Sequence, residues 1–306
     1  MRRTCWGLLL GLLVPLGAMA DEFDHGMTTL WEVLWHQSGT PTRIVRWEND
    51  IRVRFYGVNA AAYKQHTMEA LRTVTGEAGI RLIDVSDLPA AEQQANLNVE
   101  IVPDSALEDN QPCVTFLDFK TETRIDAATV QMRGRDAWRC SYHEAMHVMG
   151  VRGHPAGQTV LSYFPWKIDG LLPLDKVMLR AWYAPRMQPG MTPFEALPVL
   201  ADELVATQPN KAQAAKARDR FLAATIVQMQ SYADGKGDVP AVVKRSGKST
   251  PDGIKFGRGE MSYFLGIAYL EGATVTRDAS LAVRWLERAA TMGNRGAQAK
   301  LGAFKQ

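Results

Sequence analysis

The chain has 306 residues, of which 35 are lysine or arginine and 33 are aspartate or glutamate, and 46% of the residues are hydrophobic. This length is enough for a sizeable core and predicts two domains. Arg2 and Arg3 lie in a leader-like segment, so 35 − 2 = 33 basic residues face 33 acidic ones in the rest of the chain. Because these charges balance and no sustained basic run occurs, the composition argues against partners such as nucleic acid or an anionic membrane.

Residues 1–20 have the pattern of a secretory signal peptide. An apolar run from Trp6 to Leu16 follows the two arginines, and small residues at 18–20 (Ala-Met-Ala) precede Asp21. This pattern predicts cleavage after residue 20 and a periplasmic or secreted protein with no membrane span after cleavage. A transmembrane anchor is the alternative, but the apolar run is short for a span.

Helices and strands alternate up to residue 132. His25 and His36 lie in this region, and we expect them at surface or capping positions and not on a metal. The hydrophobic periodicity predicts helices over 27–35 and 63–75, and strands over 42–57, 80–85, 96–102 and 125–132, with a loop that carries Cys113 before the last strand.

A His-Glu-x-x-His pattern carries the chemistry of the chain. His143 and His147 are four residues apart, so on a helix they lie one turn apart on the same face. Two imidazoles at this spacing hold Zn²⁺, and Glu144 between them is placed to take a proton from the metal-bound water. Gly150 can adopt the left-handed conformation that ends the helix, and His154 follows as a third ligand. The alternative is a helix whose histidines only form hydrogen bonds in a core.

Two cysteines remain after removal of the leader, since Cys5 leaves with it. In an oxidising compartment Cys113 and Cys140 are expected to form a disulfide. Closing this loop would contribute about 3.5 kcal/mol in the chain-entropy account and would fix the start of the active-site helix. Two unpaired thiols are the alternative.

The same stretch resembles the metzincin metallopeptidases, whose signature is His-Glu-x-x-His-x-x-Gly-x-x-His followed by a methionine-containing turn. His143, Glu144, His147 and Gly150 match that signature position by position. The chain departs at the third histidine, because Gly153 occupies that position and the next histidine comes one residue later. One residue adds at most ~3.5 Å of chain and glycine gives the loop freedom, so we expect the later histidine to reach the metal.

The turn after the third histidine also departs from the pattern. Residues 159–164 (Thr-Val-Leu-Ser-Tyr-Phe) look like the serralysin-type turn, with Leu161 at the methionine position as an apolar floor. Tyr163 falls where several metzincins carry a metal-proximal tyrosine, and the resemblance implies that its hydroxyl stabilises an oxyanion. A half-buried aromatic with its hydroxyl in water is the alternative. Water or Asp169 could replace the third histidine, and an aspartate ligand at 169 or at Asp175 stays open.

The resemblance implies a fold as well as a site. It covers roughly residues 40–200 and predicts an α+β catalytic domain with a mixed twisted sheet beside the active-site helix. We expect the strand over 125–132 to pair with an extended peptide substrate. Leu-Pro-Leu-Asp at 172–175 and the run at 184–192 also look like an uncharacterised bacterial envelope family with a degenerate metzincin site.

The C-terminal third is expected to be helical. The pattern predicts helices over 195–206 and 211–232, then a Gly-, Lys- and Ser-rich loop or linker over 234–259. The resulting division is a signal peptide (1–20), a metzincin-like zinc-binding domain (21–194), a helical connector (195–258) and a helical repeat (259–306).

The last segment resembles a Sel1-like repeat, a relative of the tetratricopeptide repeat. Leu265-Gly266 recurs as Leu301-Gly302 after 36 residues. One unit and the start of a second are fewer than the ~3 repeats usually needed to stand alone. We therefore expect the α-helical repeat segment to pack on the preceding helices or on a protein partner, with Tyr269 and Trp285 in its core.

Together these patterns predict an exported zinc metalloendopeptidase that hydrolyses peptide or protein substrates. His143, His147 and His154 would hold the metal, Glu144 would act as general base and Tyr163 would help at the oxyanion. The main alternative is a non-catalytic envelope binding or adaptor protein with a structural or degenerate zinc site and a partner-binding repeat. A zinc hydrolase acting on an envelope amide is a third interpretation.

Overall fold

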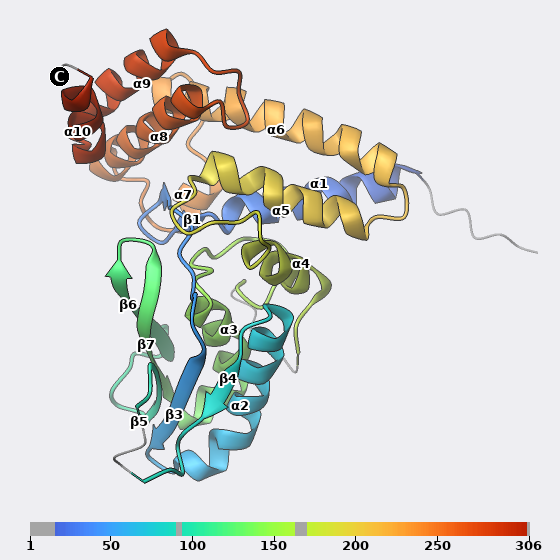
Figure 1. Cartoon of the computed structure of the whole chain (residues 1–306), viewed down its shortest axis with the longest axis vertical. Helices are drawn as coiled ribbons and strands as arrows, with labels where there is room; N and C mark the ends of the chain where they lie inside the picture. Colours follow the sequence, from blue (N-terminus) through green and yellow to red (C-terminus); the bar gives the residue numbers. More distant parts are fainter. Residues whose placement is uncertain (1–15, 90–93, 163–169, 305–306) are drawn as a thin grey trace, which may run out of the picture.

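The computed structural model describes the backbone of residues 16–89, 94–162 and 170–304, and the side chains from residue 22 onward. It has a mixed α/β part, with a sheet and two long helices, and a layer of helices at the other end (Figure 1). Among the described residues, no helix is long and apolar enough to cross a membrane.

A five-stranded mixed sheet forms the α/β part. Its spatial order is β4-β3-β5-β7-β6, in which β3, β4, β5 and β7 are parallel and β6 pairs antiparallel with β7 at the edge. The bounds are β3 Ile51–Gly57, β4 Leu82–Asp84, β5 Leu97–Val102, β6 Cys113–Thr121 and β7 Arg124–Arg133. A separate two-stranded pairing joins β1 (Trp35–His36) to β2 (Thr40–Pro41).

Strand alternation decides which face of the sheet is covered. In β3, Ile51, Val53 and Phe55 are buried while the residues between them are half-buried. Since side chains alternate between the faces of a strand, one face is apolar and the other more polar. Helices α2 (Ala60–Glu77) and α3 (Ala137–Val148) cover the apolar face, and the 3₁₀ turn η2 (Gly134–Asp136) leads from β7 into α3 (Figure 1).

The remaining helices form the second layer. Figure 1 shows α1 (Leu16–Glu32) lying beside α5, far from it in sequence, above the sheet. The other bounds are α4 Pro173–Trp182, α5 Pro193–Thr207, α6 Lys211–Asp234, α7 Ala241–Arg245, α8 Pro251–Glu271, α9 Ala279–Thr291 and α10 Arg295–Ala303. Helix α5 starts with a capping box, in which the Thr192 hydroxyl accepts from the Glu195 N–H and the Glu195 carboxylate accepts from the Thr192 N–H.

One large hydrophobic core runs through both layers, and a smaller cluster of Ile267, Leu286, Ala289 and Ala297 lies between the last helices. Buried Trp31 of α1 stacks on Phe194 of α5, and Leu265 of α8 belongs to the same cluster as Val53 of the sheet. The Arg43 guanidinium also donates to the Tyr263 hydroxyl at 2.9 Å, which joins the α/β part to α8. The C-terminal helices are therefore packed against the rest of the chain.

Several predictions about the elements differ from the structure. The strand expected over 42–57 is confined to β3, because residues 42–50 form no strand of the sheet. The segment expected to be a loop carrying Cys113 is strand β6, which occupies the sheet edge. The prediction that 125–132 pairs with a substrate is therefore wrong, because β7 already pairs with β5 and β6 on its two sides. The expected linker over 234–259 is largely helical, since α7 and the first turns of α8 fall in it.

Candidate metal centre

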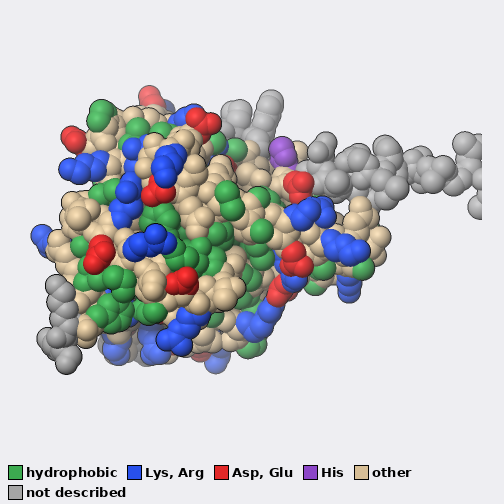
Figure 2. Space-filling model, turned by 90° about the horizontal axis from the view of Figure 1, so that it is seen from above, with side chains coloured by type: hydrophobic (Ala, Val, Ile, Leu, Met, Phe, Trp, Pro, Cys, Tyr) green, Lys and Arg blue, Asp and Glu red, His purple; other side chains and the backbone are tan. Residues whose placement is uncertain are grey.

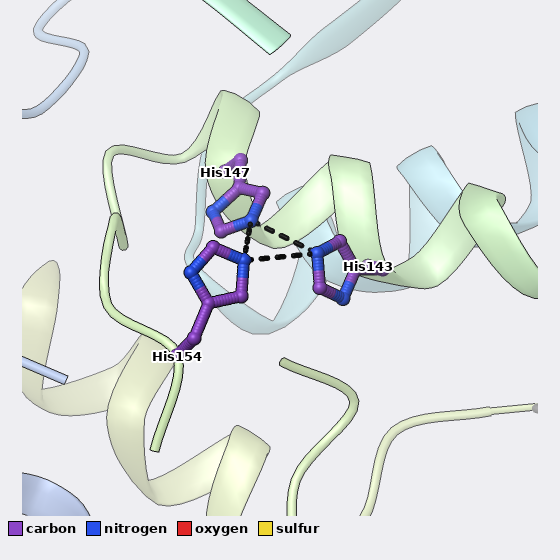
Figure 3. Close-up of side chains that lie close together, drawn as sticks. All are labelled: His143, His147 and His154. Atoms are coloured by element: carbon purple, nitrogen blue, oxygen red, sulfur yellow. Dashed lines mark hydrogen bonds between the residues drawn. The ribbon is translucent and has the colours of Figure 1, made fainter. Parts of the chain in front are cut away.

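Three histidine side chains converge beside the active-site helix. His143 and His147 lie one turn apart on α3, and His154 approaches them from the loop that follows this helix (Figure 3). The Nε2 atoms are 3.0 Å apart for His143 and His147, 3.1 Å for His147 and His154, and 3.3 Å for His143 and His154. The predicted third histidine thus points at the other two despite its shifted position.

Backbone carbonyls determine which ring nitrogens of two histidines carry the proton. The Nδ1 of His143 lies 2.9 Å from the Val160 carbonyl, and that of His147 lies 2.7 Å from the Val151 carbonyl. A carbonyl oxygen only accepts, so both Nδ1 atoms are donors. In the neutral rings both Nε2 atoms are then unprotonated lone-pair donors that face one another.

Burial keeps these rings neutral. It lowers the pKa of His143 and His147, and for His147 the neighbouring His143 and His154 lower it further. It lowers the pKa of His154 to about 3, again with help from His143. Protonating one of these buried rings is therefore an unfavourable way to remove the repulsion between the facing lone pairs. A metal cation that accepts all three lone pairs would remove the same repulsion.

The donor set fits zinc. Nitrogen ligands held tetrahedrally at about 2.0–2.1 Å from one ion lie about 3.3 Å from each other. The three Nε2 separations of 3.0, 3.1 and 3.3 Å are close to that value. In the part of the chain that the structure describes, these three histidines are the group of histidine, cysteine or carboxylate side chains arranged to hold a metal.

Glu144 is held in a defined position next to the histidines. Its side chain is buried and its Oε2 accepts a hydrogen bond from the Thr115 hydroxyl at 2.6 Å. Burial raises the pKa of Glu144 to about 7, against the lowering effect of that hydrogen bond. A carboxylate with this pKa can both take and release a proton near neutral pH.

The predicted disulfide between Cys113 and Cys140 is present. Cys113 begins β6 and Cys140 lies on α3, one turn before Glu144. Thr115 lies two residues after Cys113 and therefore on the same face of the strand, and Glu144 lies four residues after Cys140 on the same face of the helix. The disulfide between the two cysteines thus brings Thr115 opposite Glu144. The disulfide therefore aligns the edge strand with the active-site helix.

Two close backbone approaches shape the loop that carries His154. Gly150 ends the helix at φ +88°, as expected, and a Cβ there would lie 2.1 Å from the Val45 carbonyl oxygen. Gly153 passes so close to Val33 that a Cβ would lie 2.5 Å from its Cα. Gly153 therefore serves close packing on the end of α1, and the chain reaches the metal centre at the next residue.

A buried carboxylate connects this loop to the helical layer. Glu32, at the end of α1, accepts from the Ala156 N–H at 2.8 Å, two residues after His154. The same Oε2 lies 2.6 Å from the Arg245 guanidinium on α7. The side chain of Glu32 is buried, so the electrostatic attraction between the two charges is stronger than it would be in water.

The remaining predicted site residues fall in three classes. Asp175 is buried but is not a ligand, because its carboxylate accepts from the backbone N–H groups of Val160 and Leu172. It thereby supports the segment whose Val160 carbonyl orients His143. Leu161 is fully buried, as an apolar floor requires. Tyr163 and Asp169 lie outside the described residues.

The metal centre opens onto a cleft of about 1780 Å³. Residues of β6 and α3 line it, as do residues of α7, of the α7–α8 connection and of α8. The three histidines and Glu144 all face this space. The arrangement can therefore present a metal and a carboxylate to a bound molecule of considerable size.

Thr115 is a site residue that our sequence reasoning missed. Its signal was available, since it lies two residues after Cys113 and Glu144 lies four after Cys140. Treating 113–121 as a loop concealed the alternation that puts Thr115 on the same face as Cys113. Glu32 carried no such signal, because its partners are 124 and 213 residues away along the chain.

A family model for the Sel1 repeat matches residues 260–294. The match covers most of α8 and all of α9, where the repeat was expected, and Gly266 provides close contact: a Cβ there would lie 2.8 Å from the Leu286 side chain. The chain is thus a mixed α/β protein whose C-terminal helical segment contains a Sel1 repeat. No curated protein and no solved structure matches it.

Proposed function

We propose that the protein is a zinc-dependent metallopeptidase of metzincin-like type. The observation that carries the proposal is the convergence of three imidazole Nε2 atoms within 3.3 Å of one another beside a buried carboxylate, at the wall of a large cleft. Two of the rings are oriented by backbone carbonyls, as metal-binding histidines usually are.

His143, His147 and His154 would hold the ion, which when bound supplies a water of lowered pKa and polarises a carbonyl oxygen. Glu144 would accept a proton from the attacking water on its carboxylate and transfer it to the amine that leaves. Thr115 would keep that carboxylate in place through its hydroxyl.

The replacement Glu144→Gln tests this mechanism. We expect the variant to bind one zinc per chain but to digest a peptide library at least ~100-fold more slowly than the wild type, because it lacks the proton acceptor. Metal analysis and mass spectrometry of the digest, with a chelator control, measure the two properties. Glu122→Gln, at an exposed turn, is the matched control and should behave as wild type.

Unchanged peptide cleavage by the Glu144→Gln variant would overturn the mechanism. So would a wild-type digest that proceeds equally well with and without the chelator. A library that also contains non-peptide amides separates a peptidase from a hydrolase of envelope amides.

A non-catalytic adaptor is the second candidate, and the Sel1 repeat favours it, because such repeats commonly mediate protein interactions. Figure 2 shows the helical end of the molecule with basic and acidic side chains dispersed among apolar ones, a surface suited to a protein and not to a polyanion. X-ray absorption of the zinc protein distinguishes the candidates: a fourth protein ligand indicates a structural site, and a water oxygen indicates a catalytic one.

Export to the periplasm or the cell exterior belongs to the same proposal. The leader-like residues 1–20 carry it, and the Cys113–Cys140 disulfide is consistent with an oxidising compartment. Determining the N-terminal residue of the protein recovered from the native host tests it, with Asp21 as the expected first residue.

A further inference from the structure

The helical layer contributes directly to the cleft at the metal centre. Six residues between 242 and 256 line it, from α7, the α7–α8 connection and the start of α8. Among them Phe256 exposes 53% of its surface to solvent, as the first turns of α8 face the cleft. Phe304, the other half-exposed phenylalanine of the helical layer, does not line the cleft.

Strand β6 also brings apolar side chains to the same cleft. On β6, Cys113 and Thr115 both point to α3, where they meet Cys140 and Glu144. Leu117 pairs with buried Ala128, and Phe119, after a register shift between Asp118 and Phe119, pairs with buried Ile125, so the alternation of β6 continues on the face of Thr115. Paired residues of adjacent strands share a face.

These two side chains are placed to contact a ligand and not only the core. Leu117 is half-buried and Phe119 exposes 40% of its surface, and both line the cleft. The row therefore runs from the proton-handling carboxylate toward the β6–β7 turn, with apolar side chains open to the space that Phe256 faces. An apolar ligand group would cover surface that water otherwise contacts.

The wall that carries Phe256 is held in place. Arg245 pairs with buried Glu32 at 2.6 Å, and Glu32 also holds the loop of His154 through the Ala156 N–H. Gly257, next to Phe256, is buried, and a Cβ there would lie 2.6 Å from the Tyr232 hydroxyl and 3.3 Å from the Gly39 carbonyl oxygen. The position of this wall is thus coupled to the metal-binding loop.

We infer that Phe256 of the helical layer and Leu117 and Phe119 of β6 form an apolar subsite, which selects peptides with a bulky apolar side chain at one fixed distance from the cleaved bond. The inference rests on the proposed peptidase function for the cleavage, but the subsite itself requires only a bound peptide. Of the two basic residues that this wall brings to the cleft, Arg245 is already paired with Glu32, and the glutamate probe below tests whether Lys248 favours an acidic side chain instead.

Binding and cleavage of designed decapeptides test this subsite. The probes are fluorescein-labelled chains of alanine, serine and threonine with a central leucine, phenylalanine, glutamate or alanine. We expect the Glu144→Gln protein, loaded with zinc, to bind the leucine and phenylalanine peptides more tightly than the alanine one by about 10-fold or more. The wild type should cleave them at one fixed spacing from that residue, with kcat/KM raised about 10–200-fold.

Phe256→Ala should remove most of this preference in both assays while zinc content and circular dichroism stay unchanged. Phe256→Leu should keep it, because leucine is also bulky and apolar. Phe304→Ala is the matched control for loss of an exposed phenylalanine and should leave the preference intact. Leu117→Ala provides a second, independent variant, on β6, and should weaken the same preference.

The outcomes separate the subsite from the proposed reaction. Apolar preference in binding without any cleavage supports the subsite and overturns the peptidase proposal. Cleavage whose preference is the same in the wild type and in Phe256→Ala overturns the subsite and leaves the peptidase standing. Preference for the glutamate peptide, or neither binding nor cleavage of any probe, also overturns the subsite.

Discussion

At the scale of single residues, the pair of Thr115 and Glu144 determines how the candidate centre handles a proton. Glu144 is buried in α3, and its carboxylate accepts from the hydroxyl of Thr115 on the edge strand. The hydrogen bond orients the carboxylate, while burial raises its pKa to about 7. Loss of either effect is expected to change the chemistry without removing the metal ligands.

Thr115→Val removes the hydroxyl with little change in shape. We expect kcat to fall about 10–100-fold, the usual effect of losing a partner that orients a group beside a metal. Zinc content should not change, because Thr115 is not a ligand. Thr115→Ser keeps the donor and should retain most of the rate; equal kcat in the valine and serine variants would show that the hydrogen bond has no role.

The raised pKa of Glu144 predicts a pH-dependent stability difference in the metal-free protein. The unfolded chain releases this proton near the ordinary value of 4.5, but the folded chain keeps it until about pH 7. Below pH 4.5 the carboxyl group is neutral in the folded and the unfolded chain, so its burial does not lower the free energy of unfolding. Above pH 7 it is charged in both, and burying that charge lowers the free energy of unfolding by about 3 kcal/mol. Glu144→Gln should be more stable than wild type at pH 8, and the two should converge near pH 4.

Urea unfolding in chelator at both pH values measures this difference. The histidines titrate alike in both proteins, so the comparison isolates the carboxylate. A glutamine variant no more stable than wild type at pH 8 would contradict the burial of the charge.

At the scale of elements, the loop between α3 and α4 decides whether three histidines meet. Gly150 turns the chain at φ +88°, and Gly153 lets it pass against the backbone of Val33. Gly153 is thus a packing residue at the position where the metzincin signature, which this stretch resembles, has its third histidine. His154, the next residue, meets the other two rings because the loop is packed against α1, and not because the loop is flexible.

Gly153→Ala is expected to displace this loop. A Cβ there would lie 2.5 Å from Val33, so backbone must move, and we expect a loss of stability of about 1–3 kcal/mol. The larger effect should be on zinc affinity, reduced at least ~10-fold because His154 moves with the loop. Competition with a zinc-binding dye measures it.

Gly302→Ala is the control for this substitution. It lies in α10, where a Cβ would meet nothing within 4 Å, and it should be neutral or slightly stabilising. Wild-type zinc affinity in the Gly153→Ala variant would show that the loop does not need this close approach.

At the scale of the whole molecule, the α/β part and the helical layer share one hydrophobic core and one cleft. The Sel1 repeat does not form a separate body, because its helix α8 packs on α5 and α6. The pairs Arg43–Tyr263 and Arg245–Glu32 add polar contacts across the same boundary. The repeat is accordingly part of the structure that surrounds the metal centre.

Calorimetry of the full chain should show one cooperative unfolding transition. Zinc at about 100 times its Kd should move the whole transition upward, by a stabilisation of about 2.7 kcal/mol, because the ion binds only the folded state. Replacing His147 with alanine should abolish that shift. Two transitions, only one of them moved by zinc, would contradict a shared folding unit.

Local patterns in the sequence were sufficient for helix α3, its end at Gly150, the disulfide, α5, α6 and the Sel1 repeat, because helical periodicity, glycine conformation and cysteine pairing depend mainly on residue type and spacing. They did not predict α7 and the first turns of α8, which were expected to be a linker. The same patterns missed β6, whose exposed residues weaken the alternation expected of a strand. They also placed the strand now seen as β7 at the sheet edge, whereas β6 occupies that edge.

Only the tertiary structure decided which strand lies at the edge, that His154 meets the other two rings, that Thr115 holds Glu144, and that Phe256 faces the cleft. Each of these depends on contacts between segments far apart along the chain. Such contacts arise from the packing of whole elements, which the spacing of residues within one element does not determine.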